Sequence, residues 1–297
     1  MDLSSSIVDY LKIIEETFLK FQPNDKTWNS VREILKKARD EDNPKLVIEA
    51  YSCKQVFTRC LNKHSSANSN HFLTLYCTSL SCPVLDRTQE YTEAFTNILF
   101  HPKLDDYLVR KKQVYRGAVI KDKKLIKDYK IGATILTTTY LSTSKDPIVA
   151  LRFCSNDSSD SISIFCTYNI KNTQRRSALD IESISLYPEE KEVLILRYVP
   201  FTITSVKETE DGRRIKINLD ECSDETLELY RSELTNEYSI EMCDCGIELA
   251  STSLNRTRDQ QNTGCCCNKE IQLRTISGWI SEHETIGTRT SSRRPST

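Results

Sequence analysis

The sequence lacks the long apolar stretch and the basic excess that two large classes of protein need. No run approaches the roughly 18 apolar residues of a membrane-spanning helix. Lys and Arg number 41 and Asp and Glu 42, so there is no concentrated basic surface for nucleic acid phosphates. The 297 residues are 38% hydrophobic and 28% charged, which suits a soluble globular protein with one large domain or two modest ones. We therefore expect neither a nucleic acid partner nor a membrane span.

Targeting signals are also missing from both ends of the chain. Residues 1–20, MDLSSSIVDYLKIIEETFLK, are amphipathic and contain acids, whereas a secretory signal has a basic start and an uninterrupted apolar core. Residues 288–297, TRTSSRRPST, are polar and lack the apolar tail of a lipid-anchor signal. This pattern predicts a cytoplasmic protein, with export by a route that leaves no such signal as the alternative.

Metal-ligand spacing is missing from the four histidines, which are expected at exposed or capping positions: His64, His71, His101 and His283. The 12 cysteines are expected to be reduced thiols, because no export signal accompanies them. Four of them lie among apolar helical residues and are predicted to be small core side chains: Cys53, Cys60, Cys77 and Cys82.

A second group of cysteines lies near the C-terminus and comprises Cys243, Cys245 and Cys265–Cys267. Five thiols are enough to bind a metal ion, but three adjacent ligands differ from the CxxC pairs of structural zinc sites. Lipidation beside Lys269 and Arg274 is another alternative. The interpretation we favour is incidental thiols in a flexible tail, so we expect no metal.

Residues 1–112 contain no glycine and are expected to be helical. Ile7, Leu11, Ile14 and Phe18 are spaced four, three and four residues apart, which makes one apolar stripe of a helix. Similar apolar patterns recur in four further segments: 28–35, 46–61, 72–76 and 91–99. The polar stretch SSANSN, residues 65–70, predicts a loop between them.

The hydrophobic period changes near residue 113, and β-branched and aromatic residues become frequent. Strands are predicted in six segments: 114–120, 131–140, 162–170, 193–198, 201–206 and 214–219. SISIFCTYNI, residues 161–170, alternates polar and apolar residues, which is typical of a strand with one buried face. DPIVALRF, residues 146–153, starts with an Asp cap and a proline, which predicts a short helix. Helices followed by a mostly antiparallel β region at 113–221 indicate an α+β architecture.

Beyond residue 221 the patterns weaken. Residues 222–250 are expected to hold a short helix and a linker, with Leu227, Tyr230 and Leu234 on the helix. Residues 251–297 are rich in Ser, Thr, Asn, Gln and Arg, and they are predicted to be disordered because they cannot bury enough apolar surface to offset the ordering entropy.

Three short motifs lie in the β region: Val-Tyr-Arg-Gly at 114–117, Tyr-Leu-Ser-Thr-Ser at 140–144 and Glu-Lys-Glu at 190–192. Each alone has an ordinary interpretation: a strand arginine in a salt bridge, a helix cap and a solvated acidic turn. Together, in this order, about 25 and 50 residues apart and all in predicted β context, they are far more specific.

The three motifs resemble the R–S–E signature of ADP-ribosyltransferases, in the branch shared by arginine-specific vertebrate enzymes and several bacterial binary toxins. Flanking residues agree, because ALDIESIS followed by YPEEKEVLI is similar to the family's toxin-turn loop and ExE strand. The resemblance covers roughly residues 105–210. It implies a split β-sandwich of the ADP-ribosyltransferase type, mostly antiparallel, with the NAD-binding core at 113–221.

Family membership implies transfer of ADP-ribose from NAD, or alternatively NADP, to a protein side chain with release of nicotinamide. The N-glycosidic bond breaks through an oxocarbenium-like state. By resemblance, Glu192 stabilises that charge and binds the ribose 2′-hydroxyl. Arg116 holds the diphosphate and the adjoining ribose with its fork of donors. Ser142 orients Glu192.

The resemblance also implies roles for less specific positions. Gly117 lets the backbone approach the nicotinamide amide, and Phe153 lies where the family stacks an aromatic ring on nicotinamide. Glu190, two residues before Glu192, is expected to face the same side of a strand and to accept the proton of an attacking guanidinium. A Glu here goes with arginine as acceptor in this family. Tyr187 lies at the loop tip that contacts the target protein.

Two alternatives remain open at this stage. An NAD glycohydrolase on the same scaffold would use water as the acceptor. A binding module without catalysis would keep the fold, although the fold alone does not require Arg116, Ser142 and Glu192 together. Glu189 and Lys191 are expected to point away from the site and to be solvated.

Overall fold

The structure is a computed structural model that describes residues 6–53, 55–74, 83–121, 123–126, 129–154, 161–171, 175–223 and 274–275. Those up to Glu221, together with Arg274–Thr275, belong to one compact unit. The predicted helix within 222–250 lies outside the described residues, as do Cys77, Cys82, His283 and all five cysteines of the C-terminal group.

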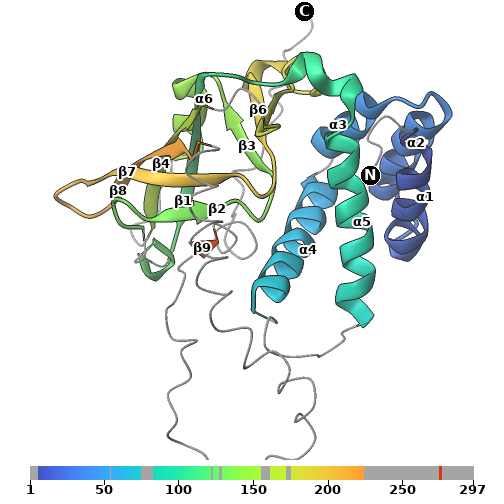
Figure 1. The fold of residues 1–297 in the computed structure, drawn as a ribbon, viewed down its shortest axis with the longest axis horizontal. Helices are drawn as coiled ribbons and strands as arrows, with labels where there is room; N and C mark the ends of the chain where they lie inside the picture. Colours follow the sequence, from blue (N-terminus) through green and yellow to red (C-terminus); the bar gives the residue numbers. More distant parts are fainter. Residues whose placement is uncertain are drawn as a thin grey trace, which may run out of the picture. The chain divides into compact units, whose positions relative to one another are not determined.

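The N-terminal part of the chain is helical, as the apolar stripes predict (Figure 1). Its helices are α1 (Val8–Thr17), α2 (Lys26–Asp40), α3 (Pro44–Cys53), α4 (Gln55–Thr74) and α5 (Pro83–Leu99), with short 3₁₀ turns η1 (Leu19–Phe21) and η3 (Pro102–Tyr107). Helix α2 begins after Asp25, whose carboxylate accepts from the N–H groups of Thr27 and Trp28 at 2.9 and 3.0 Å and so caps the helix. The four residues of the first stripe are all buried.

The loop predicted at SSANSN is wrong, because α4 continues through it. Ser65, Ser66 and Asn68 are buried there, and Asn68 is bonded to the neighbouring helix. The Nδ2 group of Asn68 donates to the hydroxyl of Thr92 at 3.2 Å, and its Oδ1 accepts from the hydroxyl of Thr88 at 3.1 Å. The polar residues here therefore form hydrogen bonds between α4 and α5 and do not form a loop.

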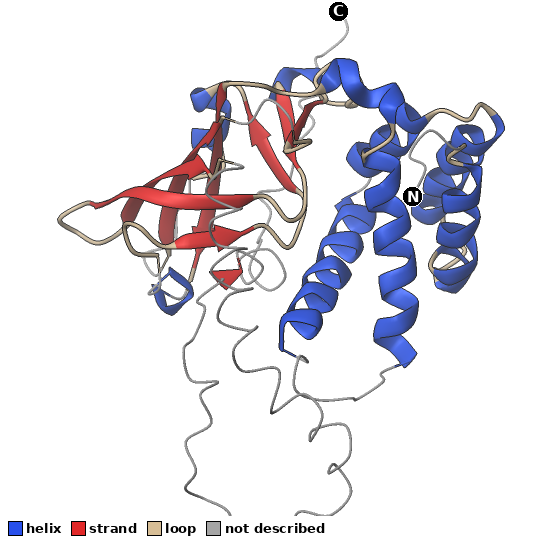
Figure 2. Cartoon of the chain, viewed as in Figure 1, coloured by secondary structure: helices blue, strands red, loops and turns tan. Residues whose placement is uncertain are grey.

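The second half of the chain forms a sheet, whose strands are red in Figure 2, with the short helix α6 (Pro147–Arg152) and the 3₁₀ turns η4 (Lys123–Ile126) and η5 (Pro188–Glu190) between them in sequence. The strands are β1 (Lys112–Ile120), β2 (Thr134–Leu136), β3 (Leu141–Ser144), β4 (Ile162–Ile170), β5 (Ala178–Asp180), β6 (Glu192–Ile195), β7 (Pro200–Glu208), β8 (Arg214–Glu221) and β9 (Arg274–Thr275). Their order is β5-β6-β3-β1-β4-β8-β7-β2-β9, with parallel pairing only for β4–β8 and β2–β9 among the described strands. The α+β class and the mostly antiparallel sheet are confirmed.

The sheet is divided between β3 and β1. All other neighbours pair over two or more residues, whereas β3 and β1 share the single pair Tyr115–Ser144. A group of three strands, β5-β6-β3, therefore meets a larger group at this point. This division agrees with the predicted split sheet.

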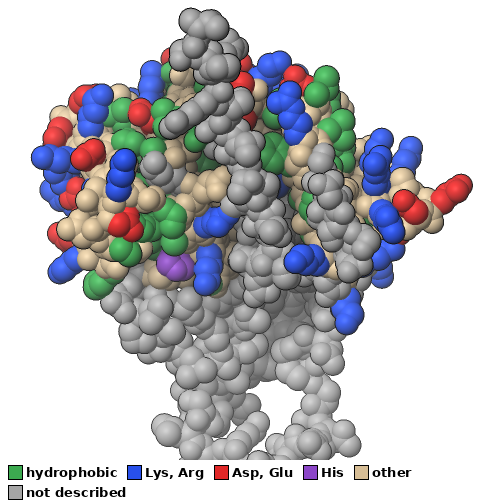
Figure 3. Space-filling model, turned by 180° about the vertical axis from the view of Figure 1, so that it is seen from behind, with side chains coloured by type: hydrophobic (Ala, Val, Ile, Leu, Met, Phe, Trp, Pro, Cys, Tyr) green, Lys and Arg blue, Asp and Glu red, His purple; other side chains and the backbone are tan. Residues whose placement is uncertain are grey.

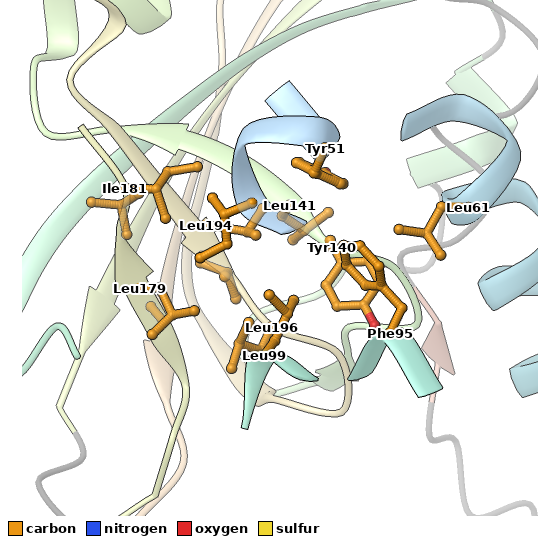
Figure 4. Packing of buried hydrophobic residues seen from close by; sticks show 14 of the residues in the cluster. Tyr51, Leu61, Phe95, Leu99, Tyr140, Leu141, Leu179, Ile181, Leu194 and Leu196 are labelled. Atoms are coloured by element: carbon orange, nitrogen blue, oxygen red, sulfur yellow. The ribbon is translucent and has the colours of Figure 1, made fainter. Parts of the chain in front are cut away.

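The helices pack against the segment that leads into β3. Tyr140 is buried, and its backbone N–H and C=O are both bonded to the side-chain amide of Asn62 on α4, at 3.0 and 3.2 Å. Its ring contacts those of Phe95 and Tyr51, with centroids 5.3 and 6.2 Å apart (Figure 4). One continuous apolar core thus joins the helical part to the sheet.

Arg197, just after β6, makes a second connection between sheet and helices. Its buried guanidinium donates to the carbonyl of Ser65 on α4 at 3.4 Å and to the hydroxyl of Thr96 on α5 at 3.2 Å. A buried charge needs such partners to offset its lost hydration. The end of β6 is therefore fixed against two helices.

The short helix α6 (Pro147–Arg152) packs closely on β1. A Cβ atom at Gly117 would lie 2.0 Å from the carbonyl oxygen of Ala150 and 2.8 Å from the sulfur of Cys154. Glycine is therefore required at this position by the backbone of α6, whatever else approaches it. Helix α6 itself is capped by Asp146, which accepts from the N–H of Ile148 at 2.9 Å.

Basic and acidic side chains are mixed on one described face of the molecule. On the face seen in Figure 3, Lys and Arg side chains are interspersed with Asp and Glu, in keeping with the net charge of −1. Among the described helices, none combines the length and apolar character needed to cross a membrane.

Replacing Asn62 by alanine is expected to destabilise the protein by about 2–4 kcal/mol, because two buried backbone groups of Tyr140 lose their partners. Urea denaturation followed by circular dichroism measures the change. Asn24→Ala, at an exposed position, is the matched control and should change stability by less than about 0.5 kcal/mol. Equal stability of both variants would contradict this role for Asn62.

Gly117→Ala is expected to lower stability by roughly 1–3 kcal/mol or more, because α6 must move away from β1. The added Cys154→Ala change relieves only the sulfur contact, so the double variant should remain close to Gly117→Ala in thermal unfolding. Full rescue by the second change would show that the sulfur, and not the backbone of Ala150, excludes the Cβ atom.

Candidate active site

The sheet order brings the three sequence motifs together. Arg116, Ser142 and Glu192 of these motifs lie on β1, β3 and β6, which are neighbours in the order β6-β3-β1. Within this set, Ser142 pairs with Leu194 and Ser144 pairs with Glu192. Residues separated by about 25 and 50 positions in sequence thus share one part of the sheet, at its division.

Arg116 and the Ser-Thr-Ser motif are in direct contact. The Nη1 group of Arg116 donates to the backbone carbonyl of Ser142 at 2.6 Å. This hydrogen bond spans the division, where β1 and β3 share only one residue pair. A charged donor on a carbonyl makes a strong hydrogen bond, so the half-buried guanidinium has a fixed position.

Glu192 is a buried carboxylate with an exposed fraction of 5%. It begins β6, and its backbone carbonyl accepts from the N–H of Ile181 at 3.0 Å. The hydroxyl of Ser185 lies 3.5 Å from its Oε2 atom and is oriented to donate. The loop before β6 therefore brings the hydroxyl of Ser185 near the carboxylate of Glu192.

Ser185 and Tyr51 are site residues that the sequence analysis missed. Tyr51, on α3, is buried, and the negative charge of Glu192 adds to burial in raising its pKa, while Arg116 lowers it. Its hydroxyl is therefore within electrostatic reach of both groups. The sequence shows Tyr51 only as one residue of an apolar stripe, and nothing in the spacing of Ser185 distinguishes it from the other loop serines.

The expected arrangement of Glu190 is wrong in its geometry. Glu190 does not share a strand with Glu192, since Pro188–Glu190 form the 3₁₀ turn η5 and β6 starts only at Glu192. Lys191 between them is left-handed, with φ 47° and ψ 49°. Proline fixes the φ angle that starts the turn, so the alternation of a strand does not apply. Glu190 lies half-buried beside the site.

The remaining predicted site residues lie around this centre. Phe153 follows α6 and is 52% exposed. Tyr187 is half-buried, and its N–H donates to the hydroxyl of Ser185 at 3.2 Å. Glu189 is exposed as predicted, whereas Lys191 is exposed but forms an ion pair with Asp146 at 3.0 Å.

His64, His101, Cys53 and Cys60 are histidines and cysteines with sequence predictions whose side chains the structure describes. His101 caps η3 by accepting from the N–H of Lys103 at 3.1 Å, as predicted. His64 is not exposed as expected but packs among aromatic rings, and burial lowers its pKa. Cys53 and Cys60 are free and half-buried. Across the part of the chain that the structure describes, no cluster of three or more His, Cys, Asp and Glu side chains could hold a metal ion.

Comparison with known proteins finds one family model that matches part of the chain. The profile of the ADP-ribosyltransferase exoenzymes matches residues 99–223, which include all three motifs and the β core expected at 113–221. The search of curated proteins gave no match.

Several solved structures are similar to this chain. Vis toxin, an ADP-ribosyltransferase from Vibrio splendidus, has 20% identity and a TM-score of 0.37, covering 71% of this chain and 92% of that chain. Exoenzyme S from Pseudomonas aeruginosa, in complex with human 14-3-3 protein beta and bound to Carba-NAD, has 16% identity and a TM-score of 0.43, covering 75% and 95%. An ADP-ribosyltransferase from Clostridium botulinum has 15% identity and a TM-score of 0.39, covering 68% and 96%.

The resemblance predicted from the motifs is thus confirmed at the level of the family. The match falls on the strands that hold Arg116, Ser142 and Glu192 together. Residues 99–223 of this chain match the family model of the ADP-ribosyltransferase exoenzymes, and this is the family that the chain resembles.

Proposed function

We propose that the chain is a mono-ADP-ribosyltransferase that moves ADP-ribose from NAD to arginine side chains of proteins and releases nicotinamide. The observation that carries the proposal is the meeting of a fixed guanidinium, a hydroxyl strand end and a buried carboxylate on neighbouring strands. The family match supports the transferase chemistry. We propose arginine as the acceptor because position 190 is a glutamate, which goes with arginine in the family that the motifs resemble.

The side chains at the division fit a dinucleotide. Arg116 supplies a guanidinium suited to a diphosphate, and Ser142 supplies a hydroxyl on the adjacent strand. Gly117 has no side chain and lies next to Arg116 in β1, in close contact with α6. Phe153 has an exposed ring that could stack on nicotinamide. These groups would bind NAD, and none of them distinguishes NAD from NADP.

Glu192 is suited to stabilise positive charge on the nicotinamide ribose. Nicotinamide leaves with the electron pair of the N-glycosidic bond, and an oxocarbenium-like sugar remains. A carboxylate already fixed in a buried position stabilises this charge with little reorganisation. The hydroxyl of Ser185 lies 3.5 Å from this carboxylate, whereas Ser142 is the residue that the family resemblance assigns to orienting it.

Glu190 is proposed to receive the acceptor. A guanidinium is a poor nucleophile while fully protonated, so a carboxylate must orient it and accept a proton as its nitrogen attacks the sugar carbon. Glu190 is half-buried in the turn before β6, next to the exposed Glu189 and the half-buried Tyr187. A protein arginine could reach this turn from solvent, with Tyr187 as part of the contact surface.

Hydrolysis of NAD on the same scaffold is the alternative function. Water needs no Glu190 to orient it, whereas the transfer reaction does. The presence of a second glutamate beside Glu192 therefore favours transfer.

Glu192→Gln is expected to lower both nicotinamide release and ADP-ribose transfer by about 10²–10³-fold, because the charge that stabilises the sugar cation is lost. Glu190→Gln is expected to lower transfer to agmatine by roughly 10²-fold while NAD cleavage persists within several-fold. Purified full-length protein with labelled NAD provides both readouts, nicotinamide release and label on agmatine.

Glu189→Gln is the matched control, because this neighbouring glutamate is exposed and should leave both rates near those of the wild type. Nicotinamide release without label on agmatine in the wild type would indicate a glycohydrolase or another acceptor. If the wild type neither cleaves nor binds NAD, the transferase proposal fails.

A further inference from the structure

The turn that carries Glu190 is fastened by three hydrogen bonds to the end of β3 and the two residues that follow it. The hydroxyl of Ser144 donates to the carbonyl of Glu190 at 2.8 Å and accepts from the N–H of Asp146 at 3.0 Å. The N–H of Lys145 donates to the carbonyl of Lys191 at 3.0 Å. The ammonium of Lys191 donates to the Oδ2 atom of Asp146 at 3.0 Å.

Lys145 also holds the other end of the loop before β6. The Nζ atom of Lys145 lies 2.8 and 2.6 Å from the two carboxylate oxygens of Asp180 and also contacts Glu182. Residues 144–146 therefore contact the loop at its start and at its end. We call Ser144, Asp146 and Lys191 the turn clamp.

Lys191 has a backbone conformation that a lysine does not favour. Its φ of 47° lies in the left-handed region, where a Cβ atom is crowded. Such a residue persists where surrounding contacts over-determine it, and these residues gather at functional sites. Here Lys191 alone separates Glu190 in η5 from Glu192 in β6, so its conformation sets the direction of one acid relative to the other.

Each oxygen of Asp146 has a separate partner. Oδ1 caps α6 through Ile148, and Oδ2 accepts from Lys191. The hydrogen bond from Lys191 is the main cause that holds the pKa of Asp146 below its usual value, so the pair stays charged at neutral pH. The side chains of Asp146 and Lys191 are 25% and 48% exposed, and ion pairs at such positions contribute little to global stability. Their effect should therefore be local.

We propose that the turn clamp positions Glu190 toward the acceptor and so sets the partition of ADP-ribose between an arginine side chain and water. This inference rests on the proposed function. The sugar cation is captured by whichever nucleophile is placed beside it, and capture by a guanidinium needs the Glu190 carboxylate in hydrogen-bonding position. Cleavage depends on Glu192, which stays fixed because β6 pairs with both β3 and β5.

Two substitutions at position 191 distinguish the effect of the Lys191 ammonium from the effect of its left-handed backbone. Lys191→Asn removes the ammonium but suits a left-handed backbone, whereas Lys191→Val removes the ammonium and opposes that backbone. Lys191→Arg keeps a cation within reach of Asp146. Ser144→Ala removes the hydroxyl that holds the carbonyl of Glu190.

The experiment measures nicotinamide release and agmatine labelling by the full-length protein, with KM for agmatine and for NAD. We expect release within about threefold of wild type in every variant, and transfer lowered about tenfold in Lys191→Val and Ser144→Ala. Lys191→Asn should lower transfer by about threefold to fivefold and Lys191→Arg should restore it. The loss should be accompanied by a raised KM for agmatine and an unchanged KM for NAD.

Lys171→Gln is the matched control, because it removes an exposed ion pair with Asp220 at the far end of β4. It should leave the ratio of transfer to hydrolysis unchanged. An unchanged ratio in Lys191→Val with an active wild type would overturn the turn clamp and leave the proposed function intact. Equal loss of both activities at unchanged thermal stability would also overturn it, since the turn would then be positioning Glu192. A wild type that never labels agmatine defeats the proposed function and this inference with it.

Discussion

The division of the sheet between β3 and β1 is the constraint on which the rest of the site depends. Where two strands share one residue pair, the backbone polar groups on either side need other partners. The guanidinium of Arg116 supplies one by donating to the carbonyl of Ser142. On its other side β3 pairs with β6, which brings Glu192 next to the strand that Arg116 touches. Arg116, Ser142 and Glu192 are thus brought together where the hydrogen-bond pairing between β1 and β3 is weakest.

The helical part of the chain has a direct share in this arrangement. Asn62 takes both backbone bonds of Tyr140, so the chain enters β3 at a position fixed by α4. Arg197 fixes the other end of β6 against α4 and α5. Tyr51 extends from α3 into the electrostatic range of Glu192. The helices therefore support the strands that hold the acid, and they are more than a separate covering layer.

Close backbone approach and an unfavourable backbone conformation both occur within this small region. Gly117 admits the carbonyl of Ala150 where a side chain could not fit, and Lys191 adopts a left-handed conformation between two glutamates. Proteins keep such features where neighbouring contacts compensate for them. The compensation here comes largely from residues 144–146, which join β3, α6 and the turn before β6.

Local patterns along the chain were enough to predict most of the elements and the family. Apolar spacing indicated the helices, alternation indicated the strands, and three short motifs predicted the ADP-ribosyltransferase resemblance, because period and motif are local properties. Packing in three dimensions made SSANSN helical, put Glu190 outside the strand of Glu192, and brought Ser185 and Tyr51 toward the acid. These outcomes depend on partners such as Thr92 on another helix or on a single left-handed residue. Contacts between distant segments leave no period in the sequence, so they could not be predicted from it.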